Sequence, residues 1–115
     1  MTGYDQPRRT PRYKFSAQAE IIVDGSGAKQ LCRVKELSLH GCFLDCPEPL
    51  SPKTHILLKI YEGHDYFEAT ANVIFSHPAL GMGIGFRDVR PAFAEVLRSW
   101  LLKAMNDTGA VLGGS

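Results

Sequence analysis

The sequence predicts a mainly β domain: a small antiparallel barrel or sandwich with one C-terminal helix docked against it. Apolar and polar residues alternate in several short segments, and these segments are separated by glycine, proline and other turn-forming residues. Near the C-terminus the apolar period changes from two to the three-four spacing of an amphipathic helix. The chain has 115 residues, enough for one domain with a modest core but not for two.

The strand pattern is clearest in residues 15–23, where alternate side chains are apolar, and in residues 66–76, where Phe67 to Phe75 are expected to be buried at period two. The turn Asp24-Gly25-Ser26-Gly27 predicts that the first strand pairs with the second as a hairpin. Gly81, Gly83 and Gly85 lie within an alternating strand, so we expect curvature and close packing there and not a dinucleotide-binding loop. The expected strands are residues 15–23, 30–37, 42–46, 55–61, 66–76 and 81–87.

The C-terminal segment is expected to be one helix that begins at Asp88 or Pro91 and ends between Asn106 and Gly109. A wide apolar stripe on this helix must be buried, most simply on an open end or side of the barrel. Residues 106–115 are expected to form a flexible tail. The stripe consists of Phe93, Val96, Leu97, Trp100, Leu101 and Ala104.

Composition narrows the functional classes. The net charge of +1 predicts no bulk attraction to nucleic acid or to an anionic membrane. No apolar run reaches the roughly 20 residues of a membrane-spanning helix, and no secretory signal is recognised, so we expect a cytoplasmic protein without membrane insertion. In that compartment Cys32, Cys42 and Cys46 are expected to be reduced, and Cys42 and Cys46 are expected to be core or half-buried thiols.

Basic charge is concentrated in the run Arg8-Arg9-Thr10-Pro11-Arg12. Pro11 biases Thr10 toward an extended conformation, so this run is expected to be an arm or loop. Guanidinium groups bind phosphate through two parallel hydrogen bonds and stack on aromatic bases. The run therefore favours a compact anionic ligand, with Arg8 and Arg12 contacting phosphate or a purine edge, and Arg9 either assisting or facing solvent.

A second stretch, Glu36-Leu37-Ser38-Leu39-His40-Gly41, places an acid, a hydroxyl and a glycine between two expected strands. Glu36 can accept hydrogen bonds from the N–H groups of a guanine edge, and Ser38 can donate or accept. Gly41 allows a close backbone approach that a side chain would block. The same pattern is also typical of a tight turn whose serine bonds only to local backbone.

Together the two stretches resemble the PilZ family, the bacterial receptor domains for the second messenger cyclic di-GMP. The family carries an Arg-x-x-x-Arg motif in an N-terminal arm, matched by Arg8 and Arg12, and an Asp/Asn-x-Ser-x-x-Gly motif, matched by Ser38 and Gly41 with Glu36 in the acidic position. The resemblance extends from about Arg8 to Met105 and includes the strand 81–86 and the helix that follows it.

The resemblance implies a six-stranded antiparallel barrel with a C-terminal helix, in which residues 1–14 form the arm, 15–105 the barrel and helix, and 106–115 the tail. It implies cyclic di-GMP as the ligand, with no cofactor and no catalysis. The arm would order over the ligand and present a new surface to motility, pilus or polysaccharide machinery, or to a second copy in a homodimer. The implied site residues are Arg8, Arg9, Arg12, Glu36, Ser38 and Gly41.

Two alternatives remain open at this point. The first is a degenerate PilZ domain that binds a protein partner without nucleotide. Glutamate is one methylene longer than aspartate, which moves the carboxylate at position 36 by about 1.5 Å away from where the family's acid would meet the guanine. The second is a small-barrel RNA or single-stranded DNA binder that uses the basic arm, although most strand aromatics are expected to face inward. Cys42, Cys46 and His40 do not form a recognisable zinc pattern, so no metal is expected.

Overall fold

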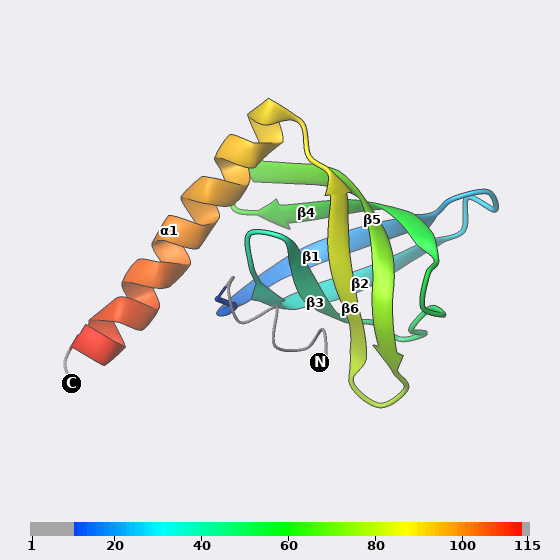
Figure 1. The fold of residues 1–115 in the computed structure, drawn as a ribbon, viewed down its shortest axis with the longest axis horizontal. Helices are drawn as coiled ribbons and strands as arrows, with labels where there is room; N and C mark the ends of the chain where they lie inside the picture. Colours follow the sequence, from blue (N-terminus) through cyan, green and yellow to red (C-terminus); the bar gives the residue numbers. More distant parts are fainter. Residues whose placement is uncertain (1–10, 114–115) are drawn as a thin grey trace, which may run out of the picture.

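The computed structural model describes residues 11–113, with side chains described as far as Asp107, and shows a closed antiparallel barrel with one helix against it (Figure 1). The barrel expected from the family resemblance is therefore confirmed, and the sandwich alternative is wrong. The elements are β1 (Tyr13–Val23), β2 (Lys29–Leu37), β3 (Gly41–Asp45), β4 (His55–Glu62), β5 (Asp65–His77), β6 (Gly81–Asp88) and α1 (Pro91–Gly113).

The strands follow one another around the barrel in the order β1-β2-β3-β6-β5-β4, and β4 closes it by pairing with β1. Each strand lies within two residues of its expected position. The largest difference is at the start of β1, where Tyr13 and Lys14 already pair with Leu37 and Glu36 of β2. The barrel therefore begins inside the segment that the sequence assigned to the arm.

The core follows the period-two pattern of the strands. Phe67, Leu58 and Ile60 are fully buried, and alternate residues of the same strands face outward. At one end Trp100 of α1 packs against Phe15 and Phe67, with ring-centroid distances of 5.3 and 6.2 Å. Because Trp100 is only 2% exposed, the helix completes the core and is not merely attached to it.

Helix α1 is longer than expected. It passes through Asn106 and Gly109 and ends at Gly113, so the predicted end between these two residues is wrong, and the helix continues into the segment that the sequence assigned to the tail. One glycine inside a helix costs only about 1 kcal/mol relative to alanine, which the flanking residues can offset. Among the helix side chains that are described, as far as Asp107, the last buried one is Ala104. Figure 1 shows the second half of helix α1 running away from the barrel. Within residues 11–113, no helix is long and apolar enough to cross a membrane.

The cysteines also differ from expectation. Cys32 and Cys46 form a disulfide, whereas Cys42 is free and buried. The expectation of three reduced thiols is wrong for this pair, because the register of β2 and β3 brings residues distant in sequence together: Arg33 pairs with Asp45, and the two cysteines flank that pair. Among the described residues, no group of three His, Cys, Asp or Glu side chains is arranged to hold a metal ion.

Candidate functional site

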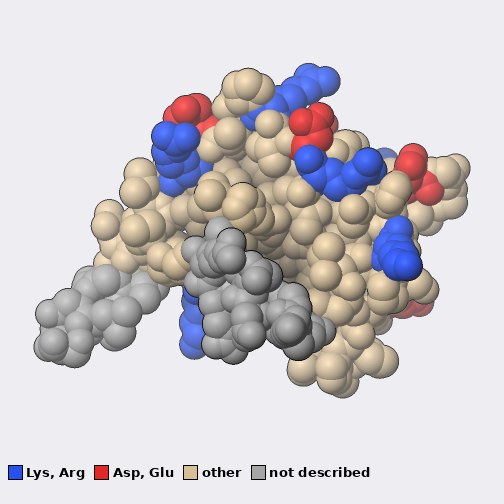
Figure 2. All heavy atoms as spheres, in the orientation of Figure 1, with Lys and Arg blue, Asp and Glu red and all other residues tan. Residues whose placement is uncertain are grey.

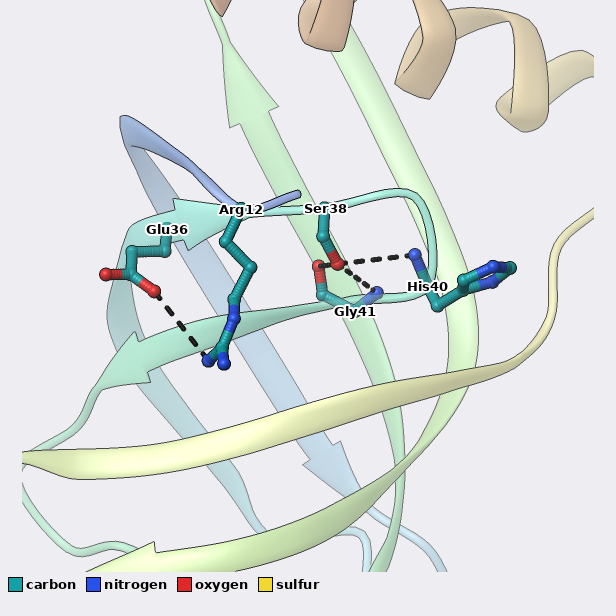
Figure 3. Close-up of polar contacts among 5 residues, drawn as sticks. All are labelled: Arg12, Glu36, Ser38, His40 and Gly41. Carbon is teal, nitrogen blue, oxygen red and sulfur yellow. Dashed lines mark hydrogen bonds and ion pairs between the residues drawn. The ribbon is translucent and has the colours of Figure 1, made fainter. Parts of the chain in front are cut away.

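The loop between β2 and β3 is held by the side chain of Ser38. Its hydroxyl oxygen accepts hydrogen bonds from the backbone N–H groups of His40 (3.3 Å) and Gly41 (3.1 Å), and the hydroxyl donates to the carbonyl of Gly41 (3.2 Å). The backbone N–H of Ser38 donates to the same carbonyl at 2.8 Å. Ser38 is 7% exposed, so its hydroxyl serves the loop itself (Figure 3).

Gly41 lets this loop approach β6 closely. Gly41 pairs with Gly85 of β6, and a Cβ atom at position 41 would overlap the carbonyl oxygen of Ile84. The N–H of Phe86 donates to the carbonyl of His40 at 2.8 Å, which ties the loop to β6 a second time. Gly41 is therefore required here by close packing between backbones.

Arg12 and Glu36 meet at the start of β1. Nη1 of Arg12 lies 4.0 Å from Oε1 of Glu36, and the two side chains are 50% and 45% exposed. In Figure 3 the Arg12 side chain lies between Glu36 and the Ser38–Gly41 loop, whereas the His40 ring points away from both. The structure thus brings one arginine of the first motif to the acidic position of the second. Arg8 and Arg9 lie outside the described residues.

Glu36 belongs to a row of outward-facing residues that crosses five strands, here called the outer row: Lys14, Glu36, Phe43, Gly83 and Phe75. Each is the pairing partner of the next on the neighbouring strand. The rings of Phe43 and Phe75 are 6.1 Å apart between centroids, and a Cβ atom on Gly83 would overlap the Phe75 ring. The outer row therefore carries an acid beside an accessible aromatic surface.

Phe75 is the functional candidate that the sequence pattern assigned wrongly. We expected it to be buried because the period-two pattern of residues 67–73 continues through it, yet it is 38% exposed. A bulge between Val73 and Phe75 inserts one residue, which turns Ile74 and Phe75 outward. The glycines of β6 could have indicated from the sequence that these two side chains face outward. Gly83 and Gly85 both leave space on the outer face of the barrel, and the side chains of Phe75 and Ile74 occupy it.

Figure 2 shows how charged side chains are distributed on one face of the molecule. On the face drawn in Figure 2, outside its grey parts, lysine and arginine side chains are scattered and several lie beside acidic ones. A continuous basic stripe, which binding of a nucleic-acid polymer normally uses, is not visible on that face.

Comparison with known proteins supports the same architecture. Among curated proteins none matches this chain. A solved structure, the PilZ domain with c-di-GMP of YcgR from Escherichia coli, superposes with a TM-score of 0.73 at 13% sequence identity, covering 94% of this chain and 98% of that one. At this identity the likeness shows a common fold. The sequence profile of the PilZ domain matches residues 6–103, which include both motifs. The chain therefore belongs to the PilZ domain family.

Proposed function

We propose that this chain is a non-catalytic receptor domain for cyclic di-GMP, acting in the cytoplasm. The observation that carries the proposal is that Arg12 and Glu36, from motifs far apart in sequence, lie 4.0 Å apart beside the Ser38–Gly41 loop. Membership of the PilZ family and the fold shared with a c-di-GMP-bound domain support it further.

The Arg12–Glu36 pair is suited to exchange partners when a ligand binds. Both side chains are about half exposed, and ion pairs of this kind contribute only about 0–1 kcal/mol. A phosphate that approaches Arg12 can accept two parallel charge-assisted hydrogen bonds from the guanidinium group, and these are stronger than the ion pair. Arg12 then binds phosphate. The released Glu36 carboxylate becomes free to accept hydrogen bonds from the N–H groups of a guanine edge.

The aromatic part of the outer row is a suitable floor for the base. Phe43 is the pairing partner of Glu36, and Phe75 lies over Gly83 on the far side of Phe43. A purine ring placed on Phe43 and Phe75 keeps its polar edge toward Glu36. Stacking of a base on an aromatic side chain contributes about 1–3 kcal/mol, so the floor adds substantially to affinity. Ser38 and Gly41 act by shaping the loop next to it.

Ordering of the N-terminal arm on ligand binding transmits the signal to a partner protein. Arg8 and Arg9, together with Arg12, close over the phosphates, and ordering the backbone opposes binding by about 1–2 kcal/mol per residue. Charge-assisted contacts to the two phosphates offset this loss. The ordered arm changes the surface beside the outer row and thereby recruits a protein of the motility, pilus or polysaccharide machinery, or a second copy of the domain.

Mapping of backbone amide shifts by NMR during titration with cyclic di-GMP tests the location of the site. We expect the largest shifts at Arg12, in residues 36–43, and around Phe75 and Gly83. Shifts confined to the exposed side of α1, between Glu95 and Asp107, would contradict the proposed site.

The alternative proposal is a degenerate PilZ domain that binds a protein partner without nucleotide. Glu36 favours it, because the longer acid changes the distance between carboxylate and base. The strongly exposed Leu39 and Leu80, 53% and 59% exposed, also favour a protein-binding surface. Unchanged NMR spectra at saturating cyclic di-GMP, together with partner binding in its absence, would support this alternative.

A further inference from the structure

The disulfide between Cys32 and Cys46 spans the hairpin that carries the second motif. Cys32 lies on β2, and Cys46 directly follows β3; their Cα atoms are 4.6 Å apart. This is the spacing of facing residues in an antiparallel pair whose backbones do not exchange hydrogen bonds, and it lies in the range that a disulfide requires. The bond therefore fits the native register of the two strands.

The segment enclosed by this bond contains the whole Glu36–Gly41 motif. At the closed end of the hairpin the loop is fixed by Ser38. At the open end the disulfide joins the strands, and the side chain of Gln30 exchanges two hydrogen bonds with the backbone of Glu48 next to it (2.6 and 3.0 Å). The motif is thus held between a hydrogen-bonded loop and a covalent link.

Between the Ser38 loop and the disulfide, strands β2 and β3 are only weakly paired with each other. Strand β3 has only 5 residues, and its ladder with β2 is interrupted by a register shift between Val34 and Glu36. An interrupted ladder on a short strand opens locally more easily than the longer β1–β4 and β4–β5 ladders, which have no register shift. Opening of the disulfide is therefore expected to loosen Glu36 and Phe43, which are partners across that ladder.

We propose that Cys32 and Cys46 are a reversible redox pair that sets the order of the β2–β3 hairpin and, through it, the affinity for nucleotide. The redox role rests on the cytoplasmic location, and the control of affinity on the receptor function, that are proposed above. Disulfides in reducing compartments are mostly transient and redox-sensing, so a bond at this position in a cytoplasmic receptor fits a switch better than a permanent staple.

The chemistry needs a peroxide as the oxidant and a dithiol as the reductant. Cys32 is half-buried while Cys46 is 7% exposed, so Cys32 is the thiolate that a peroxide reaches. Its attack breaks the O–O bond and leaves a sulfenic acid and a hydroxide or alkoxide, which takes up a proton from solvent to give water or an alcohol. The Cys46 thiolate then forms the S–S bond and expels hydroxide, which takes up a proton. A dithiol returns two electrons and two protons and becomes a disulfide itself.

Cys42 is set apart from this pair. It is buried and free, and burial raises the pKa of its thiol, so little thiolate is available there to compete in exchange. Cys42→Ser is therefore the matched control: it removes a thiol from the same hairpin without touching the proposed redox pair.

The experiment compares the full chain after treatment with hydrogen peroxide and after dithiothreitol, alongside Cys32→Ser, Cys46→Ser and Cys42→Ser. Intact-protein mass spectrometry reports the loss of two hydrogens on disulfide formation. Hydrogen exchange reports the order of residues 36–43, and calorimetry reports binding of cyclic di-GMP. We expect the oxidised protein and oxidised Cys42→Ser to exchange more slowly and to bind at least about fivefold more tightly than the reduced forms.

The readouts separate the two proposals. A disulfide that does not form under peroxide, or hydrogen exchange that is the same in both redox states, would overturn the redox pair. Equal affinity in both states would overturn its control of binding. If hydrogen exchange changes with redox state while no form binds cyclic di-GMP, the redox effect on the hairpin is supported and the proposed receptor function fails.

Discussion

Replacement of Gly41 by alanine tests how the motif loop is built, because Gly41 and Gly85 are partners across β3 and β6 but have different surroundings. A Cβ atom on Gly41 would overlap the backbone carbonyl of Ile84, which can move only if the β3–β6 ladder shifts. A Cβ atom on Gly85 would meet the end of the Ile74 side chain, at 2.9 and 3.2 Å from Cδ1 and Cγ1. That side chain is 59% exposed and can rotate away.

The magnitude follows from these surroundings. Forced overpacking typically costs about 1–3 kcal/mol, and alanine returns up to about 1 kcal/mol by restricting the unfolded chain. Because the overlap at position 41 is with backbone, we expect Gly41→Ala to lower the free energy of unfolding by about 2 kcal/mol. Gly85→Ala should change it by no more than about 0.5 kcal/mol.

Thermal unfolding followed by circular dichroism measures the difference. For a domain of this size about 1 kcal/mol corresponds to roughly 4 °C, so Gly41→Ala should unfold about 8 °C below the wild type, and Gly85→Ala within about 2 °C of it. Equal unfolding temperatures for the two variants would refute the reasoning, because the close approach of the loop to β6 would then place no demand on residue 41.

Three further predictions concern the aromatic floor, the disulfide and a titrating tyrosine. Phe75→Ala should weaken binding of cyclic di-GMP about tenfold, since one stacking contact is lost. An unchanged dissociation constant would exclude Phe75 from the site. Reduction of Cys32–Cys46 should lower the free energy of unfolding in urea by about 3 kcal/mol, and Cys32→Ser should show no response to reductant. Burial, and next the hydrogen bond donated to Glu68, raise the pKa of Tyr66. The stability that this gives is complete below the ordinary tyrosine pKa of about 10 and is lost as pH rises above it, because the unfolded chain ionises first. Tyr66→Phe should flatten that alkaline decline in urea unfolding, and an equal decline in both proteins would contradict the assignment.

The fold could be read from the sequence to the extent that it depends on local periodicity. The alternation of apolar and polar residues located the strands. The change from period two to a three-four spacing identified the helix whose Trp100 enters the core. The helix end was wrong because Gly109 is a weak breaker when helix-compatible residues follow it.

The parts of the site that depend on register were not accessible from the sequence. The bulge turns Phe75 outward because Phe75 pairs with Gly83 of β6 after the register shift. The disulfide follows from the alignment of β2 with β3. The candidate motif residues were chosen from their type and spacing and from the family resemblance. That Arg12 reaches Glu36 depends on the pairing of Lys14 with Glu36 at the start of the barrel, a contact between segments distant in the chain.

The central claim is that Arg12 and Glu36 form one nucleotide site, and isothermal titration of cyclic di-GMP tests it most directly. The proteins are the wild type, Arg12→Ala, Glu36→Asp and, as a control with the same loss of charge, Arg98→Ala on the exposed side of α1. We predict micromolar or tighter binding by the wild type that is lost in Arg12→Ala and kept in Arg98→Ala. Tighter binding by Glu36→Asp would show that the longer acid detunes the pocket. Absence of binding in the wild type, or equal binding by wild type and Arg12→Ala, would contradict the account.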